Sequence, residues 1–248
     1  MAFRIALQLY TIRGETGKDF FGACKQVRDI GYEYVEAAGF GGHSPTAVKR
    51  EFDNIGLKLI GSHVSIESVL QTPEIVIEHH REMECDIVTI PGVPESMRKT
   101  YDDWIRTANE IEKSAQIFAD AGLQLAYHNH DVEFRNFDGK TLWEILFAHA
   151  PKLAAQIDVF WVHKANYDSV ELIQKMKGKV HQIHAKDLAQ DGSDTEIGTG
   201  TLPWNKILRA CKVAGTKDLI VEMDFPKLAP FVSAKLSLEN LKKFIAEI

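Results

Sequence analysis

Short apolar runs alternate with longer amphipathic runs along the whole chain. The short runs have the length and the content of branched and aromatic residues that are typical of strands, and the longer runs have apolar residues at helical spacing. The pattern predicts eight strands, over Ile5–Leu9, Tyr34–Ala38, Lys58–His63, Ile87–Pro91, Gln124–His130, Ala154–Asp158, Val180–Lys186 and Leu219–Asp224.

Helical patterns lie between these strands, and several of them end at a glycine, the residue that most often caps a helix C-terminus. The clearest patterns cover Asp19–Ile30, Thr46–Ile55, Asp103–Ala121 and Leu202–Ala214, and the glycines after them are Gly31, Gly56, Gly122 and Gly215. About eight strand–helix units with no long linker predict one closed (β/α)8 TIM barrel, an α/β fold, as a single domain over residues 1–248. An open doubly wound sheet is the alternative.

The first predicted strand is followed by the sequence YTIRGE, which has no GxGxxG motif. No GxxxxGK[ST] motif occurs elsewhere in the chain. Dinucleotide and nucleoside triphosphate sites of the usual kind are therefore not supported.

The composition is that of a globular protein, with 248 residues, 45% hydrophobic and 26% charged residues, and a net charge of −6. A disordered chain and a membrane-spanning chain are excluded. The acidic balance does not favour nucleic-acid binding, which needs a basic surface. We expect a small-molecule partner, no nucleic acid, no membrane, and allow for a homo-oligomer.

The three cysteines, Cys24, Cys85 and Cys211, lie in apolar stretches without CxxC spacing, so we expect them to be buried packing residues. The first residues lead directly into a predicted strand and show no export signal. We therefore expect a cytoplasmic location.

Polar side chains gather at the C-terminal ends of the predicted strands, where TIM barrels carry their active sites. Because side chains alternate along a strand, residues two apart point to the same face. We expect the following residues to converge: Gln8, Glu36, His63, His128, His130, Asp158, His184, Lys186, Glu222 and Asp224.

Three of these residues, Asp158, His184 and Glu222, are of metal-ligand type and lie on neighbouring predicted strands. Buried together they would remain uncompensated unless a cation or substrate balanced them, so we predict that they bind one divalent metal ion. Carboxylate and imidazole ligands suit Mn²⁺, Co²⁺, Mg²⁺ or Zn²⁺ without choosing between them. A lone Glu36 or His63 is equally well explained as a structural residue.

Six motifs in this order resemble the xylose isomerase-like TIM barrels of the sugar phosphate isomerase/epimerase family, nearly from end to end. The motifs are LQLYTIR from residue 7, YHNHDVEF from 127, IDVFW from 157, HAKD from 184, EIGTG from 196 and VEMD from 221.

The resemblance implies a divalent metal held by Glu, Asp, His and Glu at the ends of strands five to eight. It carries the last three ligands onto Asp158, His184 and Glu222. By strand position the first ligand falls on His128, and the nearest carboxylate is Glu133 in the following loop. Both alternatives stay open, and we favour His128 because strand residues are held more rigidly than loop residues.

The resemblance also implies proton abstraction next to the carbonyl of a keto sugar or sugar derivative, through a metal-stabilised enediolate. We expect Glu222 to act as base, His128 or Glu133 as its partner, and Lys186 to stabilise the developing negative charge. The predicted substrate-binding residues are Gln8, Glu36, His63, His130 and Trp161. Trp161 could equally pack in the core, and Arg13 could meet a phosphate or carboxylate or simply lie on the surface.

Other functions remain open. A dehydratase or lyase of a keto sugar, keto-inositol or 3-keto-glycoside would use the same site and the same first step. An apurinic endonuclease-like activity is disfavoured by the acidic balance and the small ligand set. A non-catalytic sugar-binding barrel is the remaining alternative, since a fold does not guarantee an activity.

Overall fold

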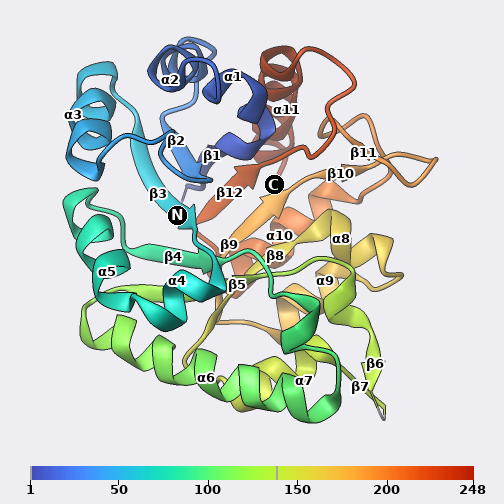
Figure 1. Ribbon diagram of the computed structural model, residues 1–248. Coiled ribbons are helices and arrows are strands. Elements are labelled where there is room, and N and C mark those ends of the chain that lie inside the picture. Colours follow the sequence, from blue (N-terminus) through green and yellow to red (C-terminus); the bar gives the residue numbers. More distant parts are fainter. Residues whose placement is uncertain (1, 138) are drawn as a thin grey trace.

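The computed structural model describes residues 2–137 and 139–248, so Met1 and Asp138 of the predicted single domain lie outside the described residues. Eight parallel strands form a closed barrel in the order β1-β12-β9-β8-β5-β4-β3-β2, and helices surround it (Figure 1). The predicted TIM barrel is confirmed, and the open sheet is excluded.

The barrel strands are β1 (Arg4–Gln8), β2 (Tyr34–Ala37), β3 (Lys58–His63), β4 (Ile87–Ile90), β5 (Gln124–His128), β8 (Ala154–Asp158), β9 (Val180–Ala185) and β12 (Asp218–Val221). The helices are α1 (Arg13–Thr16), α2 (Phe20–Asp29), α3 (Pro45–Ile55), α4 (Ile66–Gln71), α5 (Pro73–Glu82), α6 (Tyr101–Asp120), α7 (Leu142–His149), α8 (Val159–Lys164), α9 (Ser169–Lys175), α10 (Trp204–Ala214) and α11 (Pro230–Ala246). Shorter pieces are the 3-10 helices η1 (Leu9–Ile12), η2 (Glu95–Met97) and η3 (Val132–Phe134), and the hairpins β6 (Asn136–Phe137) with β7 (Lys140–Thr141) and β10 (Asp187–Leu188) with β11 (Asp194–Thr195).

All eight predicted strands are present, but most of them end earlier than predicted. His130, Lys186, Glu222 and Asp224 follow their strands instead of belonging to them. The chain leaves the sheet there because the mouth of the barrel is built from loops, in which side chains meet partners from several strands.

Local sequence signals set the helix ends. The side chain of Ser44 accepts from Ala47 N at the start of α3, and Gly56 ends that helix in the left-handed conformation with φ of 73°. Gly215 ends α10 in the same way with φ of 87°. These caps satisfy backbone groups that a helix leaves unpaired.

The interior of the barrel changes from apolar to polar along the strands. Ala6, Ile60 and Ile220 form a small apolar layer inside the barrel. At the C-terminal ends the strand register places Gln8 beside Glu36 and Asp158 beside His184. The polar layer therefore lies where the mouth of the barrel begins.

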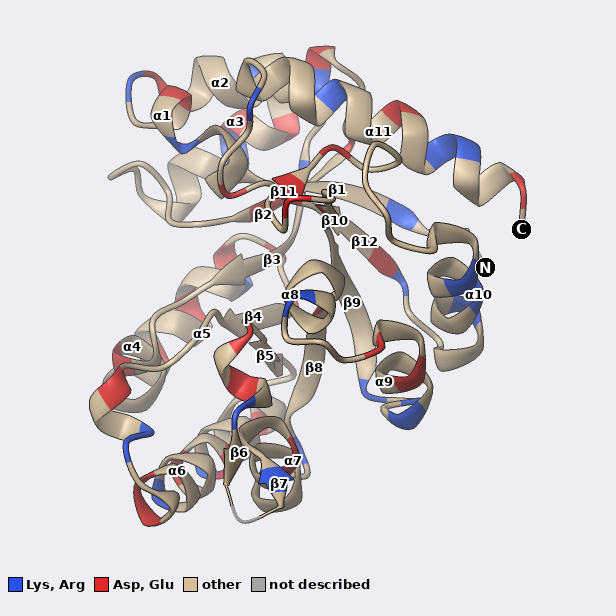
Figure 2. Ribbon diagram, turned by 90° about the vertical axis from the view of Figure 1, so that its right-hand side faces the viewer, with Lys and Arg blue, Asp and Glu red and all other residues tan. Residues whose placement is uncertain are grey.

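The outer surface carries acidic and basic residues side by side, as the helices α6 and α11 show (Figure 2). The three cysteines are buried and free, as predicted. Among the described residues, no helix combines the length and the apolar character that a bilayer crossing requires.

Candidate metal centre and active site

Four side chains at the barrel mouth bring metal-ligating atoms together. One atom each of His128, Asp158, His184 and Glu222 lies within 4.8 Å of the others, and all four residues are buried. They come from β5, β8, β9 and the residue after β12, which are neighbours in the barrel. The structure thus brings the predicted ligand residues into one cluster.

Two atoms of this cluster form no hydrogen bond with a described residue, Nδ1 of His128 and Oδ2 of Asp158, although Lys186 Nζ lies 3.2 Å from Oδ2. The other oxygen of Asp158 accepts from Trp161 N at 3.1 Å and so caps α8. Burial raises the pKa of Asp158 to about 6. Buried polar atoms normally have partners, so Nδ1 of His128 is available to a ligand, while Oδ2 of Asp158 has only its ion pair with Lys186.

His184 lies between two carboxylates. Its Nδ1 is 2.9 Å from Oε2 of Glu222, and its Nε2 is 2.6 Å from Oε2 of Glu36. Burial opposes the charged imidazole, but Glu222 and Glu36 outweigh burial and raise the pKa of His184 to about 10. A carboxylate on the far nitrogen of a ligand histidine is a common arrangement in metal sites, where it fixes the tautomer.

Glu36 is the centre of a hydrogen-bond network below the mouth. Its side chain is 0% exposed and also accepts from Gln8 Nε2 at 2.7 Å and from Gln156 Nε2 at 2.6 Å. A Cβ at residue 61 would lie 2.9 Å from Oε1 of Glu36, so Gly61 leaves the room that the network needs. Burial would raise the pKa of Glu36, but the histidines around it lower the pKa.

We predicted that Gln8 and Glu36 would contact substrate; in the structure both are fully buried, and Gln8 donates to Glu36. Both oxygens of Glu36 already accept hydrogen bonds. Gln156 and Gln182, which the sequence analysis missed, complete this layer with a hydrogen bond of 2.9 Å. Strand alternation could have found them, because Gln156 shares a face with Asp158 and Gln182 with His184.

Lys186 is fully buried among three carboxylates. Its Nζ lies 2.7 Å from Asp224, 2.8 Å from Glu222 and 3.2 Å from Asp158. Burial opposes the charged ammonium, but these carboxylates outweigh burial and raise its pKa. The ammonium therefore stays charged beside the ligand cluster.

The charges of this buried group do not balance. Four carboxylates, those of Glu36, Asp158, Glu222 and Asp224, face only Lys186 and His184, so negative charge is in excess even when His184 is protonated. Together with the unpartnered Nδ1 of His128, this excess of negative charge fits a divalent cation, and His184 would give up its proton to bind that cation.

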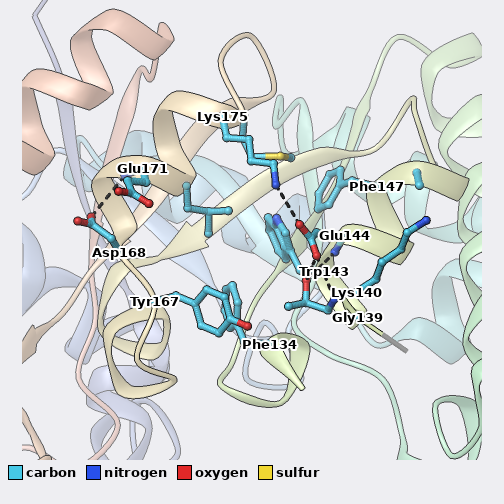
Figure 3. A pocket seen from close by; sticks show the side chains of 14 residues that line it. Phe134, Gly139, Lys140, Trp143, Glu144, Phe147, Tyr167, Asp168, Glu171 and Lys175 are labelled. Atoms are coloured by element: carbon cyan, nitrogen blue, oxygen red, sulfur yellow. Dashed lines mark hydrogen bonds and ion pairs between the residues drawn. The ribbon is translucent and has the colours of Figure 1, made fainter. Parts of the chain in front are cut away.

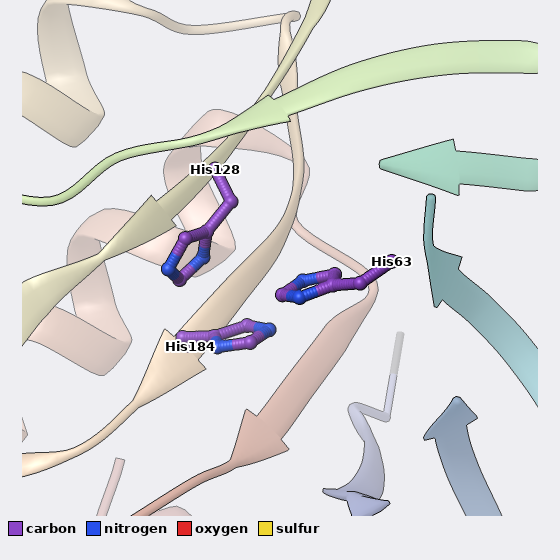
Figure 4. Close-up of side chains that lie close together, drawn as sticks. All are labelled: His63, His128 and His184. Atoms are coloured by element: carbon purple, nitrogen blue, oxygen red, sulfur yellow. The ribbon is translucent and has the colours of Figure 1, made fainter. Parts of the chain in front are cut away.

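His63, His128 and His184 form a second group of close ligand atoms (Figure 4). Nε2 of His63, however, is 2.9 Å from Oε1 of Gln156 and 3.3 Å from Oε2 of Glu36. The His184 nitrogen that faces Glu36 is engaged as well. The group with Asp158 and Glu222 is therefore the better candidate for the ion.

Glu133 lies outside the ligand cluster. Its Oε1 accepts from the Tyr127 hydroxyl at 2.9 Å, and its Oε2 accepts from His130 N at 2.7 Å. Burial raises the pKa of Glu133. Of our two alternatives for the first ligand, the structure brings His128 to the cluster, while Glu133 holds the backbone of the loop that carries His130.

His130 and Trp161 lie side by side at the mouth, with ring centroids 5.2 Å apart. Burial and the nearby Lys186 lower the pKa of His130 to about 4. Trp161 is half-buried, and its Nε1 has no partner among the described residues. Arg13 is exposed and donates to the backbone carbonyl of Asp224 at 2.7 Å.

A family model described as the xylose isomerase-like TIM barrel matches residues 24–244 of the chain. The chain belongs to this family. A search of curated proteins, in contrast, found no match.

Solved structures of similar fold cover almost the whole chain. A sugar phosphate isomerase/epimerase from Parabacteroides distasonis has a TM-score of 0.85 at 22% identity, over 98% of this chain and 100% of its own. An L-ribulose 3-epimerase has a TM-score of 0.72 at 14% identity, over 99% and 97% of the two chains. A Bacillus anthracis protein named a probable 3-DHS dehydratase has a TM-score of 0.76 at 13% identity, over 98% and 99%. At these identities the likeness establishes the fold.

Proposed function

We propose that this barrel is a divalent-metal-dependent isomerase or epimerase of a keto sugar or sugar derivative, which moves a proton next to a carbonyl group. The observation that carries the proposal is the cluster of His128, Asp158, His184 and Glu222, with ligand atoms within 4.8 Å of one another and Lys186 beside them.

His128, Asp158, His184 and Glu222 would hold the ion. When bound, a divalent cation supplies Lewis-acid stabilisation of negative charge on substrate oxygens. The ligand set does not select among Mn²⁺, Co²⁺, Mg²⁺ and Zn²⁺.

Glu222 is the proposed base. Its Oε2 faces His184 and Lys186, whereas Oε1 has no hydrogen bond with a described residue. Lys186 and His184 outweigh the effect of burial and hold the pKa of Glu222 well below its usual value, so the carboxylate is ionised. Oε1 can take a proton from the carbon next to the substrate carbonyl, and the electron pair of that bond moves onto the carbonyl oxygen. In an isomerisation the hydroxyl proton of that carbon then passes to the former carbonyl oxygen, and Glu222 returns its proton to the former carbonyl carbon. In an epimerisation a second acid on the opposite side would deliver a proton to the other face of the same carbon, and Glu222 keeps the proton that it took.

Lys186 would stabilise the oxygen on which charge develops through its positive charge. Its ammonium is buried and held by ion pairs, so it needs little reorganisation during the reaction. His130 and Trp161 would contact the sugar, His130 as a neutral hydrogen-bonding group and Trp161 through its ring or its unpartnered N–H. His63, whose ring centroid lies 5.1 Å from that of His128, would meet substrate beside the cluster.

Glu36 would act as a positioning residue. Its hydrogen bond to Nε2 of His184 would leave Nδ1 free to bind the ion, and its other contacts hold the network in place. This role replaces the substrate contact that we predicted for Glu36.

A dehydratase of a related keto compound is the second candidate. The likeness to the structure named a probable 3-DHS dehydratase favours it. Such an enzyme would remove the same proton and then expel a hydroxyl group as water. Both activities remove the same proton, so only the product that forms distinguishes a dehydratase from an isomerase or epimerase.

The test is deuterium incorporation in D₂O. The metal-loaded protein is incubated with a panel of keto sugars, with and without phosphate, and NMR follows loss of the proton next to the carbonyl. We expect the wild-type protein to exchange it and to form an isomer or epimer. Loss of water instead would identify the dehydratase.

Glu222→Gln should keep the fold and slow the exchange at least ~100-fold, the lower end of what a general base contributes. Glu196→Gln is the matched control, because Glu196 is a buried carboxylate that bonds to Thr195 and Ser233 outside the cluster. Exchange at the wild-type rate in Glu222→Gln would show that the base is another residue. A metal-loaded protein that exchanged none of the panel would contradict the proposal.

A further inference from the structure

A cavity of about 530 Å³ lies between α7 and α9, and none of its lining residues belongs to the candidate active site (Figure 3). The hairpin of β6 and β7 and the segment before α9 contribute to its walls. Its volume is in the range of small-molecule pockets, which are about 300–1,000 Å³. Its apolar lining consists mainly of Phe134, Trp143, Phe147, Tyr167, Leu172 and Met176.

The aromatic rings form a continuous surface in this cavity. The ring centroids of Trp143 and Phe147 are 4.5 Å apart, those of Phe134 and Tyr167 are 5.0 Å apart, and Phe134 stacks on Trp143 at 6.2 Å. Tyr167 is 42% exposed. A flat aromatic molecule would extend this surface by stacking on it.

The indole N–H of Trp143 has no hydrogen-bond partner among the described residues, although Trp143 is only 2% exposed. Two other buried tryptophans differ in this respect. Trp104 donates to Leu142 O at 2.7 Å, and Trp204 donates to Asp187 at 2.8 Å. Trp161, the other tryptophan without a partner, lies in the candidate active site. An unpaired buried donor is costly, so the N–H of Trp143 is available to an acceptor from outside the chain.

We propose that this cavity is a second ligand site, for an uncharged, flat aromatic molecule of one or two rings that carries a hydrogen-bond acceptor. The rings would stack on the ligand, and the Trp143 N–H would donate to its acceptor. Met176, a lining residue that is half-buried, unbranched and flexible, can move to admit such a ligand.

The charged rim favours an uncharged ligand over an anion. Glu144 and Lys175 are paired at 2.9 Å, and Asp168 is engaged as the N-cap of α9. The carboxylates of Glu144, Asp168 and Glu171 outnumber the two cations, Lys140 and Lys175. An acidic ligand would therefore meet a net negative rim.

The test compares quinoline with naphthalene, which have the same shape and differ in one ring nitrogen that can accept a hydrogen bond. Each is titrated at pH 7.5 into the full ¹⁵N-labelled chain, and NMR follows the indole N–H signals. We expect a saturable shift of the Trp143 signal, with quinoline bound about fivefold more tightly, as one added hydrogen bond predicts. In Trp143→Phe, chemical shifts of the neighbouring backbone amides should report equal affinity for the two probes.

Leu172→Trp should fill the cavity and abolish binding. Val213→Trp is the matched control, since Val213 is an exposed residue of α10 outside the cavity. The proposal is overturned if neither probe gives a saturable shift, or if Leu172→Trp binds as the wild-type chain does. A preference for quinoline that survives in Trp143→Phe would overturn the role of the indole. If neither probe binds, and the wild-type chain forms a dimer that Leu172→Trp abolishes, the lining of the cavity is instead a contact surface for a second copy of the chain.

Discussion

Replacing Glu36 by glutamine keeps the size of the side chain and removes its charge. In the wild-type chain one oxygen of Glu36 accepts from His184 and Gln8, and the other accepts from Gln156. A glutamine has only one oxygen. If that oxygen stays with His184 and Gln8, the new amide group faces the Nε2 donor of Gln156. If it turns toward Gln156, the amide faces the Nε2–H of His184.

The network offers no easy relief from this conflict. Gln156 would have to flip, but its amide nitrogen also donates to Gln182 at 2.9 Å and its oxygen bonds to His63 at 2.9 Å. An unsatisfied buried donor costs about 1–3 kcal/mol. Loss of a partner behind a metal-binding histidine typically lowers metal affinity about 10–100-fold. We therefore expect Glu36→Gln to lose about 1–3 kcal/mol of unfolding free energy and about 10–100-fold in metal affinity.

The assay is equilibrium dialysis against Zn²⁺ or Mn²⁺, combined with urea unfolding of the metal-free protein. Long-range ¹H–¹⁵N spectra of the Zn²⁺-loaded protein should show the proton of His184 on Nε2 in the wild-type chain and a disturbed signal in the variant. Glu133→Gln is the matched control, because Glu133 is also a buried carboxylate but lies outside the cluster. Wild-type metal affinity and an unchanged His184 signal in a destabilised Glu36→Gln would refute the positioning role.

Four further substitutions test the site and its surroundings. In a side-by-side metal titration, His128→Ala should lose affinity while Glu133→Ala keeps it, and a large loss only in Glu133→Ala would reverse the choice of ligand. Lys186→Met leaves three carboxylates without their cation, so the metal-free protein should lose about 3–5 kcal/mol of unfolding free energy. Added metal should raise the Tm of this variant more than it raises the Tm of the wild-type chain. If the metal-free variant and the metal-free wild-type chain had equal Tm values, the proposed charge balance would be wrong. Asp187→Ala should lower the unfolding free energy measured in urea by about 3–5 kcal/mol, because the buried Asp187 accepts from four backbone N–H groups and from Trp204. A loss below about 1 kcal/mol would show that these donors find other partners.

The barrel could be predicted from the sequence because each strand and helix has its own local pattern of apolar and polar residues. The convergence of Asp158, His184 and Glu222 could be predicted because the parallel strands of a barrel end at the same face. His128 joins them since it is the last residue of β5. These are consequences of strand position alone.

The contacts that depend on loops could not be predicted from strand position. Glu133 turns back to Tyr127 because the 3-10 turn η3 reverses the chain, and nothing in the local pattern fixes that turn. Likewise, the role of Glu36 depends on donors from three other strands, Gln8, Gln156 and His184. Only the folded structure shows that these partners use both of its oxygens.

The most direct test of the central claim is the metal stoichiometry of the wild-type chain, Asp158→Ala and His184→Ala, measured after removal and return of a divalent ion. His181→Ala is the matched control, since His181 lies on the same strand as His184 but near its opposite end. We predict one bound ion per chain in the wild type and in His181→Ala, and at least ~100-fold weaker binding in the other two variants, which should still fold. One tightly bound ion in both Asp158→Ala and His184→Ala would contradict the account.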